Sequence, residues 1–218
     1  MLILFDLDDS LLDHQAAGRA AAIDLYENRG ITLPLPEFLT VWEEAHARNY
    51  ARYYAGELSF EEQRRTRLRE VINPTLTNQE TDDLLARYNS VYEKNWALFP
   101  DALPCLDRLS PHRLGLISNG EGELQRQKLN KSGLAERFEC IVISSECGYA
   151  KPDKRIFHHA CELLNEKPQN AVYIGDRYDI DAQAAREAGL TGYWLDRKKA
   201  ATNTHKAPVI TSLAQFLL

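Results

Sequence analysis

The sequence predicts an α/β fold in three layers, with a parallel sheet between two layers of helices and an α-helical domain inserted after the first strand. From residue 101 onward, short apolar runs alternate with helical periodicity, which is typical of parallel strands joined by helices. Between residues 11 and 99 the periodicity is helical, without a convincing strand. We therefore expect a sheet-based core that is interrupted by a separate helical domain.

The expected strands are short runs that are apolar throughout, without the alternation of a half-exposed strand. Such runs suit a parallel sheet that is buried on both faces, and right-handed crossovers would place helices on each face. The runs are residues 2–5, 114–117, 140–143, 171–174 and 193–195, and helical patterns between them lie at 124–132, 155–164 and 181–188.

The inserted domain is expected to hold three or four helices, which proline and glycine residues separate. Ser59 followed three residues later by Glu62 indicates a capping box at the start of one helix. The helical stretches lie near residues 15–29, 36–56, 59–71 and 78–96, so we place this domain at 13–96 and the core at 1–12 and 97–218.

The composition excludes several classes of protein. The chain has 218 residues with 26 basic and 32 acidic side chains, and its net charge of −6 argues against partners such as nucleic acid polymers or an anionic membrane. The apolar start, residues 1–5, is too short for a signal peptide or a membrane span. The four cysteines lack zinc-ligand spacing, so we expect reduced thiols in a cytoplasmic protein. The sequence predicts no particular oligomeric state.

Polar side chains follow four of the expected strands at their carboxyl ends, where ligands bind in open α/β sheets. Helix capping would explain any one of them, but four such strand ends in order favour a ligand site. Carboxylates without a nearby histidine or cysteine suit a hard cation, Mg²⁺ before Zn²⁺. The residues are Asp6 and Asp8 after the first run, Ser118 and Asn119 after the second, Lys151 beyond the third and Asp176 after the fourth.

These strand ends resemble the four motifs of the haloacid dehalogenase superfamily of phosphohydrolases. The resemblance implies a Rossmann-like core and identifies the inserted helices as the small cap of that family. It is closest to the branch that contains pyrimidine nucleotidases and acylneuraminate phosphatases. The matching residues are Asp6-Leu7-Asp8-Asp9-Ser10 for D-x-D-x-[T/S], with serine where threonine is more frequent, then Ser118, then Lys151 before Pro152, and finally Gly175-Asp176 with Asp181.

The residues predict phosphoryl transfer through a covalent intermediate. Asp6 is the expected nucleophile and would become an aspartyl-phosphate. Asp8, two residues later, would protonate the leaving alcohol and then act as base toward water. The resemblance further implies that Mg²⁺ is held by the Asp6 carboxylate, the backbone carbonyl of Asp8 and Asp176.

The same resemblance implies roles for the other polar residues. Lys151, Ser118 and the backbone N–H of Asn119 would bind the substrate and stabilise charge on its phosphoryl oxygens. Asp181, ahead of Asp179 because it fits the motif spacing, is expected to orient metal-bound water or Lys151.

Asp8 also distinguishes between activities, because the dehalogenases of the superfamily lack an aspartate two residues after the nucleophile. We expect a phosphatase for small phosphate monoesters, with nucleoside monophosphates slightly favoured over sugar phosphates. A phosphosugar mutase of the same fold, which protects the aspartyl-phosphate from water, is the close alternative. A non-catalytic binding module with the same fold is the second alternative.

Substrate choice is expected in the inserted helices. Trp42, His46, Asn49, Tyr50 and Tyr53 share one helix face, and they either line a substrate site or form a seam of the helix bundle. The four arginines between positions 64 and 69 are more consistent with a solvated helix face than with a phosphate site.

Overall fold

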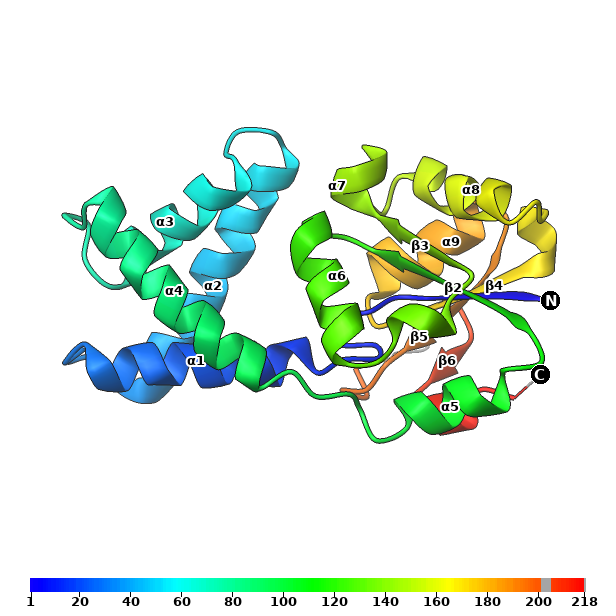
Figure 1. Ribbon diagram of the computed structural model, residues 1–218, viewed down its shortest axis with the longest axis horizontal. Helices are drawn as coiled ribbons and strands as arrows, with labels where there is room; N and C mark the ends of the chain where they lie inside the picture. Colours follow the sequence, from blue (N-terminus) through cyan, green and yellow to red (C-terminus); the bar gives the residue numbers. More distant parts are fainter. Residues whose placement is uncertain (201–204, 218) are drawn as a thin grey trace. The chain divides into compact units, whose positions relative to one another are not determined.

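The computed structural model describes residues 1–200 and 205–217, and the chain divides into two compact units. The core unit contains Met1–Asp13 and the described residues from Ala97 onward, and the strands belong to it. The helical unit is His14–Trp96. Figure 1 shows the blue first strand within the sheet of the core unit and the helices of the helical unit in blue to green.

A parallel sheet lies at the centre of the core unit, with six strands among the described residues, in the order β3-β2-β1-β4-β5-β6. This topology confirms the predicted α/β fold with a Rossmann-like sheet. The first five strands contain the predicted runs, whereas β6 is too short to produce a recognisable pattern. The bounds are β1 (Leu2–Phe5), β2 (Arg113–Ser118), β3 (Cys140–Ile143), β4 (Ala171–Gly175), β5 (Thr191–Leu195) and β6 (Val209–Ile210).

Strand β1 lies between β2 and β4, where the strand order reverses. Phe5, its last residue, is in register with Leu116 of β2 and Ile174 of β4. The backbone N–H of Asp6 continues the pairing by donating to the Ile174 carbonyl at 2.9 Å. The carboxyl ends of three strands therefore meet around Asp6, at the type of switch point where α/β proteins bind ligands.

In the core unit, a helix begins within a few residues of the end of β2, of β3 and of β4. On α8, Phe157 packs edge-to-face on Tyr173 of β4, with ring centroids 5.0 Å apart. The predicted helix at 181–188 differs in form, because a π-helical turn, Tyr178–Gln183, precedes a short α9. The bounds are α5 (Ala102–Arg108), α6 (Gly122–Lys131), α7 (Ser144–Cys147), α8 (Lys154–Leu163) and α9 (Ala184–Glu187).

The helical unit consists of α1 (His14–Asn28), α2 (Leu35–Tyr54), α3 (Phe60–Val71) and α4 (Asn78–Lys94). The predicted capping box is present at α3, where Ser59 Oγ accepts the Glu62 N–H at 3.1 Å and Glu62 Oε2 accepts the Ser59 N–H at 2.8 Å. Among the described residues, no helix combines the length and the apolar character that crossing a membrane requires.

The prediction of a solvated arginine face on α3 is wrong for Arg67. This side chain is buried, with its guanidinium 4.4 Å from the ring centroid of Trp42 and 5.2 Å from that of Tyr88. It also donates to His46 Nδ1 at 2.6 Å. Since cation–π packing offsets the cost of burying the guanidinium, Arg67 belongs to the interior of the helical unit. Trp42 and Asn49 are buried as well, which favours the bundle seam for these two residues.

Candidate active site

Asp6 and Lys151 lie at the centre of a buried ion-pair network in the core unit. Lys151 Nζ donates to Asp6 Oδ1 at 2.6 Å, to Asp181 Oδ1 at 2.7 Å and to the Tyr173 hydroxyl at 2.8 Å. The side chains of Lys151 and Asp181 are 2% and 1% exposed. One ammonium therefore connects the residue that follows β1 with Tyr173 on β4 and with Asp181 in the π-helical turn after it.

Burial and the neighbouring charges set the protonation states of this network. Burial acts to lower the pKa of Lys151, but the carboxylates of Asp181 and Asp6 outweigh it and hold that pKa well above the usual value. Burial raises the pKa of Asp6 to about 7, although Lys151 acts in the opposite direction. Lys151 is therefore a cation throughout the neutral range.

The Asp176 carboxylate forms no ion pair with a lysine or arginine among the residues that the structure describes. Burial, and then the negative charges of Asp6 and Asp181, raise its pKa to about 9. Its backbone carbonyl accepts a hydrogen bond from Trp194 Nε1 at 2.8 Å, whereas its carboxylate accepts none from the residues that the structure describes. Oxygens of Asp6, Asp176 and Asp181 lie within 4.8 Å of one another. This all-oxygen, excess-negative donor set fits a hard divalent cation such as Mg²⁺.

Asp181 is occupied on both carboxylate oxygens. Oδ1 accepts from Lys151, and Oδ2 accepts the backbone N–H of Arg177 at 2.9 Å. Gly175 makes this position possible, because a Cβ there would lie 2.6 Å from Asp181 Oδ2. Asp179 lies instead at the surface, 3.4 Å from Arg177 Nη2. The contacts suit Asp181 for orienting Lys151.

Asp8 is held by a second lysine, which comes from α6. Lys128 Nζ lies 2.8 Å from both carboxylate oxygens of Asp8, and Gln125 Nε2 donates to Oδ2 at 2.9 Å. Lys128 and Gln125 are each only 1% exposed, whereas the Asp8 side chain is 24% exposed. The donors are thus buried, while the carboxylate that they hold remains accessible to solvent.

Ser118 and Asn119, at the end of β2, join the same network. Gln125 Nε2 donates to Ser118 Oγ at 2.6 Å. The Asn119 side chain accepts the Lys151 backbone N–H at 2.8 Å and donates to the Lys151 carbonyl at 2.9 Å. The side chain of Asn119 therefore fixes the backbone segment from which Lys151 projects.

The loop after β1 is fixed by its own polar contacts. Asp9 has a φ of 60°, in the left-handed region that aspartate tolerates better than most residues, and its N–H donates to the Leu12 carbonyl at 2.7 Å. Ser10 Oγ donates to Asp6 Oδ2 at 3.0 Å. Ser10 thus supplies a hydroxyl contact to Asp6 from the last position of the D-x-D-x-[T/S] pattern.

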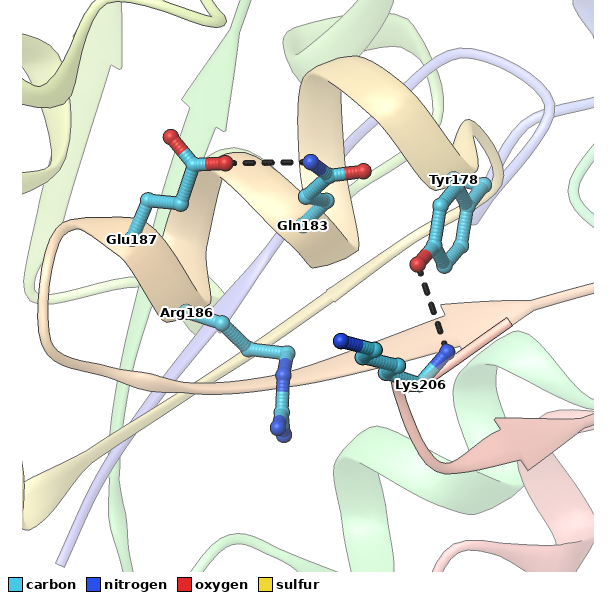
Figure 2. Close-up of a pocket in the computed structure, with 5 residues that line it drawn as sticks. All are labelled: Tyr178, Gln183, Arg186, Glu187 and Lys206. Carbon is cyan, nitrogen blue, oxygen red and sulfur yellow. Dashed lines mark hydrogen bonds between the residues drawn. The ribbon is translucent and has the colours of Figure 1, made fainter. Parts of the chain in front are cut away.

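A hollow of about 400 Å³ lies at the surface of the core unit (Figure 2). Within it, Gln183 Nε2 donates to Glu187 Oε1 at 3.0 Å, and the Lys206 N–H donates to the Tyr178 hydroxyl at 3.3 Å. Its described lining carries both signs of charge and includes none of the predicted site residues, so we base the candidate site on the strand ends. The lining residues are Tyr178, Gln183, Arg186, Glu187 and Lys206.

Three residues of the network were not predicted from the sequence: Gln125, Lys128 and Tyr173. Gln125 and Lys128 share the buried side of α6 with Leu129. Their signal in the sequence was weak, because α6 has only two apolar side chains, Leu124 and Leu129, to mark its buried side. Tyr173 lies inside an apolar strand run, where nothing distinguishes it from a packing residue.

Comparison with known proteins identifies the family of the chain. The haloacid dehalogenase-like hydrolase family matches residues 1–189. A phosphoserine phosphatase from Thermus thermophilus is 31% identical over 90% of this chain and 88% of its own length. The pyrimidine 5'-nucleotidase YjjG of Escherichia coli is 35% identical over 44% of each chain. The HAD-hydrolase YfnB from Bacillus subtilis, solved bound to magnesium, aligns with a TM-score of 0.80 at 24% identity, over 98% of this chain and 95% of its own.

The site at the switch point of a parallel α/β sheet, together with the family match over residues 1–189, defines the class of the protein. The chain belongs to the haloacid dehalogenase-like hydrolases. It is an enzyme of the phosphoric monoester hydrolase class, as its phosphatase and nucleotidase relatives are. The predicted family and enzyme class are thereby confirmed.

Proposed function

We propose that the protein is a Mg²⁺-dependent phosphatase that hydrolyses small phosphate monoesters through an aspartyl-phosphate on Asp6. The observation that carries this proposal is the position of Asp6 at the switch point, with one oxygen bound by Lys151 and the other by Ser10. Contacts on both oxygens orient the carboxylate for attack on phosphorus. Nucleoside monophosphates stay slightly ahead of sugar phosphates in this proposal, and one relative, matched over 44% of each chain, is a pyrimidine 5'-nucleotidase.

Mg²⁺ would be held by the carboxylates of Asp6 and Asp176 and by the backbone carbonyl of Asp8. Two observations support this: the raised pKa of Asp176, which reflects its burial and then the negative charges of Asp6 and Asp181, and the magnesium in the YfnB structure. When bound, the ion supplies charge neutralisation and Lewis-acid polarisation of a phosphoryl oxygen.

The remaining residues would act directly on the substrate. Lys151 and Ser118, with the backbone N–H of Asn119, would bind the phosphoryl oxygens and stabilise their developing charge. Asp8 would protonate the departing alcohol oxygen as Asp6 attacks phosphorus. It would then take a proton from water as the bond between phosphorus and Asp6 breaks.

We also propose that the protein works in the cytoplasm on a small-molecule substrate, without nucleic acid or membrane partners. All four cysteines lie in the described part of the chain and are free thiols, which supports a reducing compartment. Selection among substrates by the helical unit stays a prediction.

Phosphate release from a panel of phosphorylated metabolites, with Mg²⁺ and with EDTA, tests the proposal. We expect steady turnover that needs Mg²⁺ and no bisphosphate activator, and a loss on the order of 10³-fold or more in Asp6→Asn, because the nucleophile is removed. Dependence on a bisphosphate activator would identify a mutase instead. An inert wild type, or an Asp6→Asn variant equal to it, would favour the binding module.

A further inference from the structure

We infer that Lys128 and Gln125 are positioning residues that hold the Asp8 carboxylate in place for the second half of the reaction, in which water attacks the aspartyl-phosphate. The inference rests on the proposed function and assigns a role to two residues of α6 that no motif of the sequence contains. It follows from their contacts, their burial and the element that carries them.

The contacts constrain the orientation of Asp8. Lys128 Nζ lies 2.8 Å from each carboxylate oxygen, so the ammonium is centred on the carboxylate and restricts its rotation. Gln125 Nε2 adds a donor to Oδ2 at 2.9 Å and distinguishes the two oxygens. A carboxylate held in this way by charge-assisted hydrogen bonds has a defined position.

The burial of Lys128 shows that this is not an ordinary surface ion pair. The Lys128 side chain is 1% exposed, and burying an ammonium is costly unless a charged partner and good geometry offset the desolvation. An exposed lysine side chain samples many rotamers in water, whereas the packing around Lys128 restricts it to one position. Lys128 and Gln125 are also three residues apart on one helix, so the same rigid element supplies both donors.

Gln125 further couples Asp8 to the end of β2. Its Nε2 donates to Ser118 Oγ at 2.6 Å as well as to Asp8. A single amide nitrogen therefore links the residue that would accept the proton of water with a residue that would hold the phosphoryl oxygens. This arrangement sets the distance between the Asp8 carboxylate, which would take a proton from the attacking water, and Ser118, which would hold the phosphoryl group under attack.

In this hydrolysis step, the residues present account for every bond and proton that changes. The water oxygen bonds to phosphorus, the bond between phosphorus and the Asp6 oxygen breaks, and its electron pair restores the Asp6 carboxylate. The proton of water passes to the Asp8 carboxylate, and inorganic phosphate leaves. Because misplacement of a reacting group by about 1 Å costs on the order of 10²-fold in rate, release of Asp8 from α6 should slow this step.

The test is Lys128→Met with p-nitrophenyl phosphate, followed by rapid mixing and by mass measurement of the quenched protein. The nitrophenolate leaving group needs little protonation, so the first step depends weakly on Asp8. We expect a nitrophenolate burst within about threefold of the wild-type rate, then steady turnover reduced on the order of 10²-fold, with phosphorylated protein accumulating. Gln125→Leu should shift the same quantities in the same direction, and it carries the test if Lys128→Met does not fold.

Three controls separate positioning from general damage. Lys128→Arg retains a cation and should recover at least about tenfold of the lost turnover. Lys154→Met removes an exposed lysine, 3.7 Å from Glu187, and should behave as wild type. In an Asp8→Asn background, Lys128→Met should cause little further loss, because it acts through Asp8.

Equal slowing of both steps, absence of accumulated phosphoprotein, or a full additional loss in the Asp8→Asn background would overturn the inference. These outcomes differ from failure of the proposed function. A wild type that forms no phosphoprotein and releases no phosphate refutes the phosphatase, whereas an active wild type with an unaffected Lys128→Met variant refutes the positioning role alone.

Discussion

Removal of the Lys151 ammonium should destabilise the core unit far more than removal of a surface lysine. Lys151→Met keeps a side chain of similar length but deletes the cation that donates to Asp6, Asp181 and Tyr173 at 2.6, 2.7 and 2.8 Å. The Lys151 side chain is 2% exposed, so water cannot replace it easily. Two carboxyl groups are then left buried without their common partner.

The expected magnitude follows from this burial. Removing one partner of a buried ion pair costs about 3–5 kcal/mol in the free energy of unfolding, because the remaining charge stays desolvated. Lys154 provides the matched control, since its pair with Glu187 spans 3.7 Å and both side chains are about half exposed, at 52% and 51%. Lys154→Met should therefore change the same free energy by about 0.5 kcal/mol or less.

Urea unfolding followed by circular dichroism, in EDTA at pH 8, measures both variants. The slope of free energy against urea should be unchanged, so that the difference appears in the midpoint. At pH 5 the cost of Lys151→Met should shrink, because Asp6, with a pKa of about 7, is then protonated and needs no cation. A loss below about 1 kcal/mol at pH 8, or one equal to that of Lys154→Met, would refute the reasoning.

Three further predictions concern the same strand ends. The folded-state pKa values of Asp6 and Asp176, about 7 and about 9, exceed the ordinary 3.8, so the metal-free protein should lose stability as the pH rises from 4 to 9. Thermal unfolding in EDTA tests this, and a flat profile would contradict it; added Mg²⁺ should restore the lost stability. Gly175→Ala should lower kcat by about tenfold or more, since the new Cβ displaces Asp181, and unchanged kinetics would argue against that contact. Ser10→Ala should reduce kcat/KM by about tenfold, because the hydrogen bond to Asp6 is lost. Ser10→Thr keeps the hydroxyl and should stay within about threefold of the wild type. Equal losses in the two variants would indicate packing instead.

The sheet could be predicted because its five longer strands are largely buried and therefore contain apolar runs. Strand β6, Val209–Ile210, contains too few residues for such a run. The π-helical turn Tyr178–Gln183 also has no periodic signature of its own, so the sequence indicated an ordinary helix nearby. Burial of Arg67 depends on aromatic rings of two other helices, and the charge pattern of α3 alone favours a solvated face.

The candidate site shows the same division between local and distant information. Asp6, Ser118 and Asp176 could be proposed from sequence because parallel register brings residues at strand ends to one edge of the sheet. The partner of Asp8 could not, since Lys128 is 120 positions away and lies outside every motif that the sequence showed. Spacing within a motif predicts which elements carry the chemistry, whereas tertiary contacts decide which cation each carboxylate meets.

The distribution of these cations explains how three neighbouring aspartates can have different roles. Asp6 is paired with Lys151, which it shares with Asp181, and Asp8 is paired with Lys128. Asp176 is buried near the same negative charges and has a pKa raised to about 9, and no described lysine or arginine pairs with its carboxylate. The two aspartates proposed to react thus each contact a buried lysine, which leaves the third for the proposed Mg²⁺. On the proposed function, a site built in this way gains net attraction for a phosphate when Mg²⁺ binds, which would account for an anionic substrate in a protein with a net charge of −6.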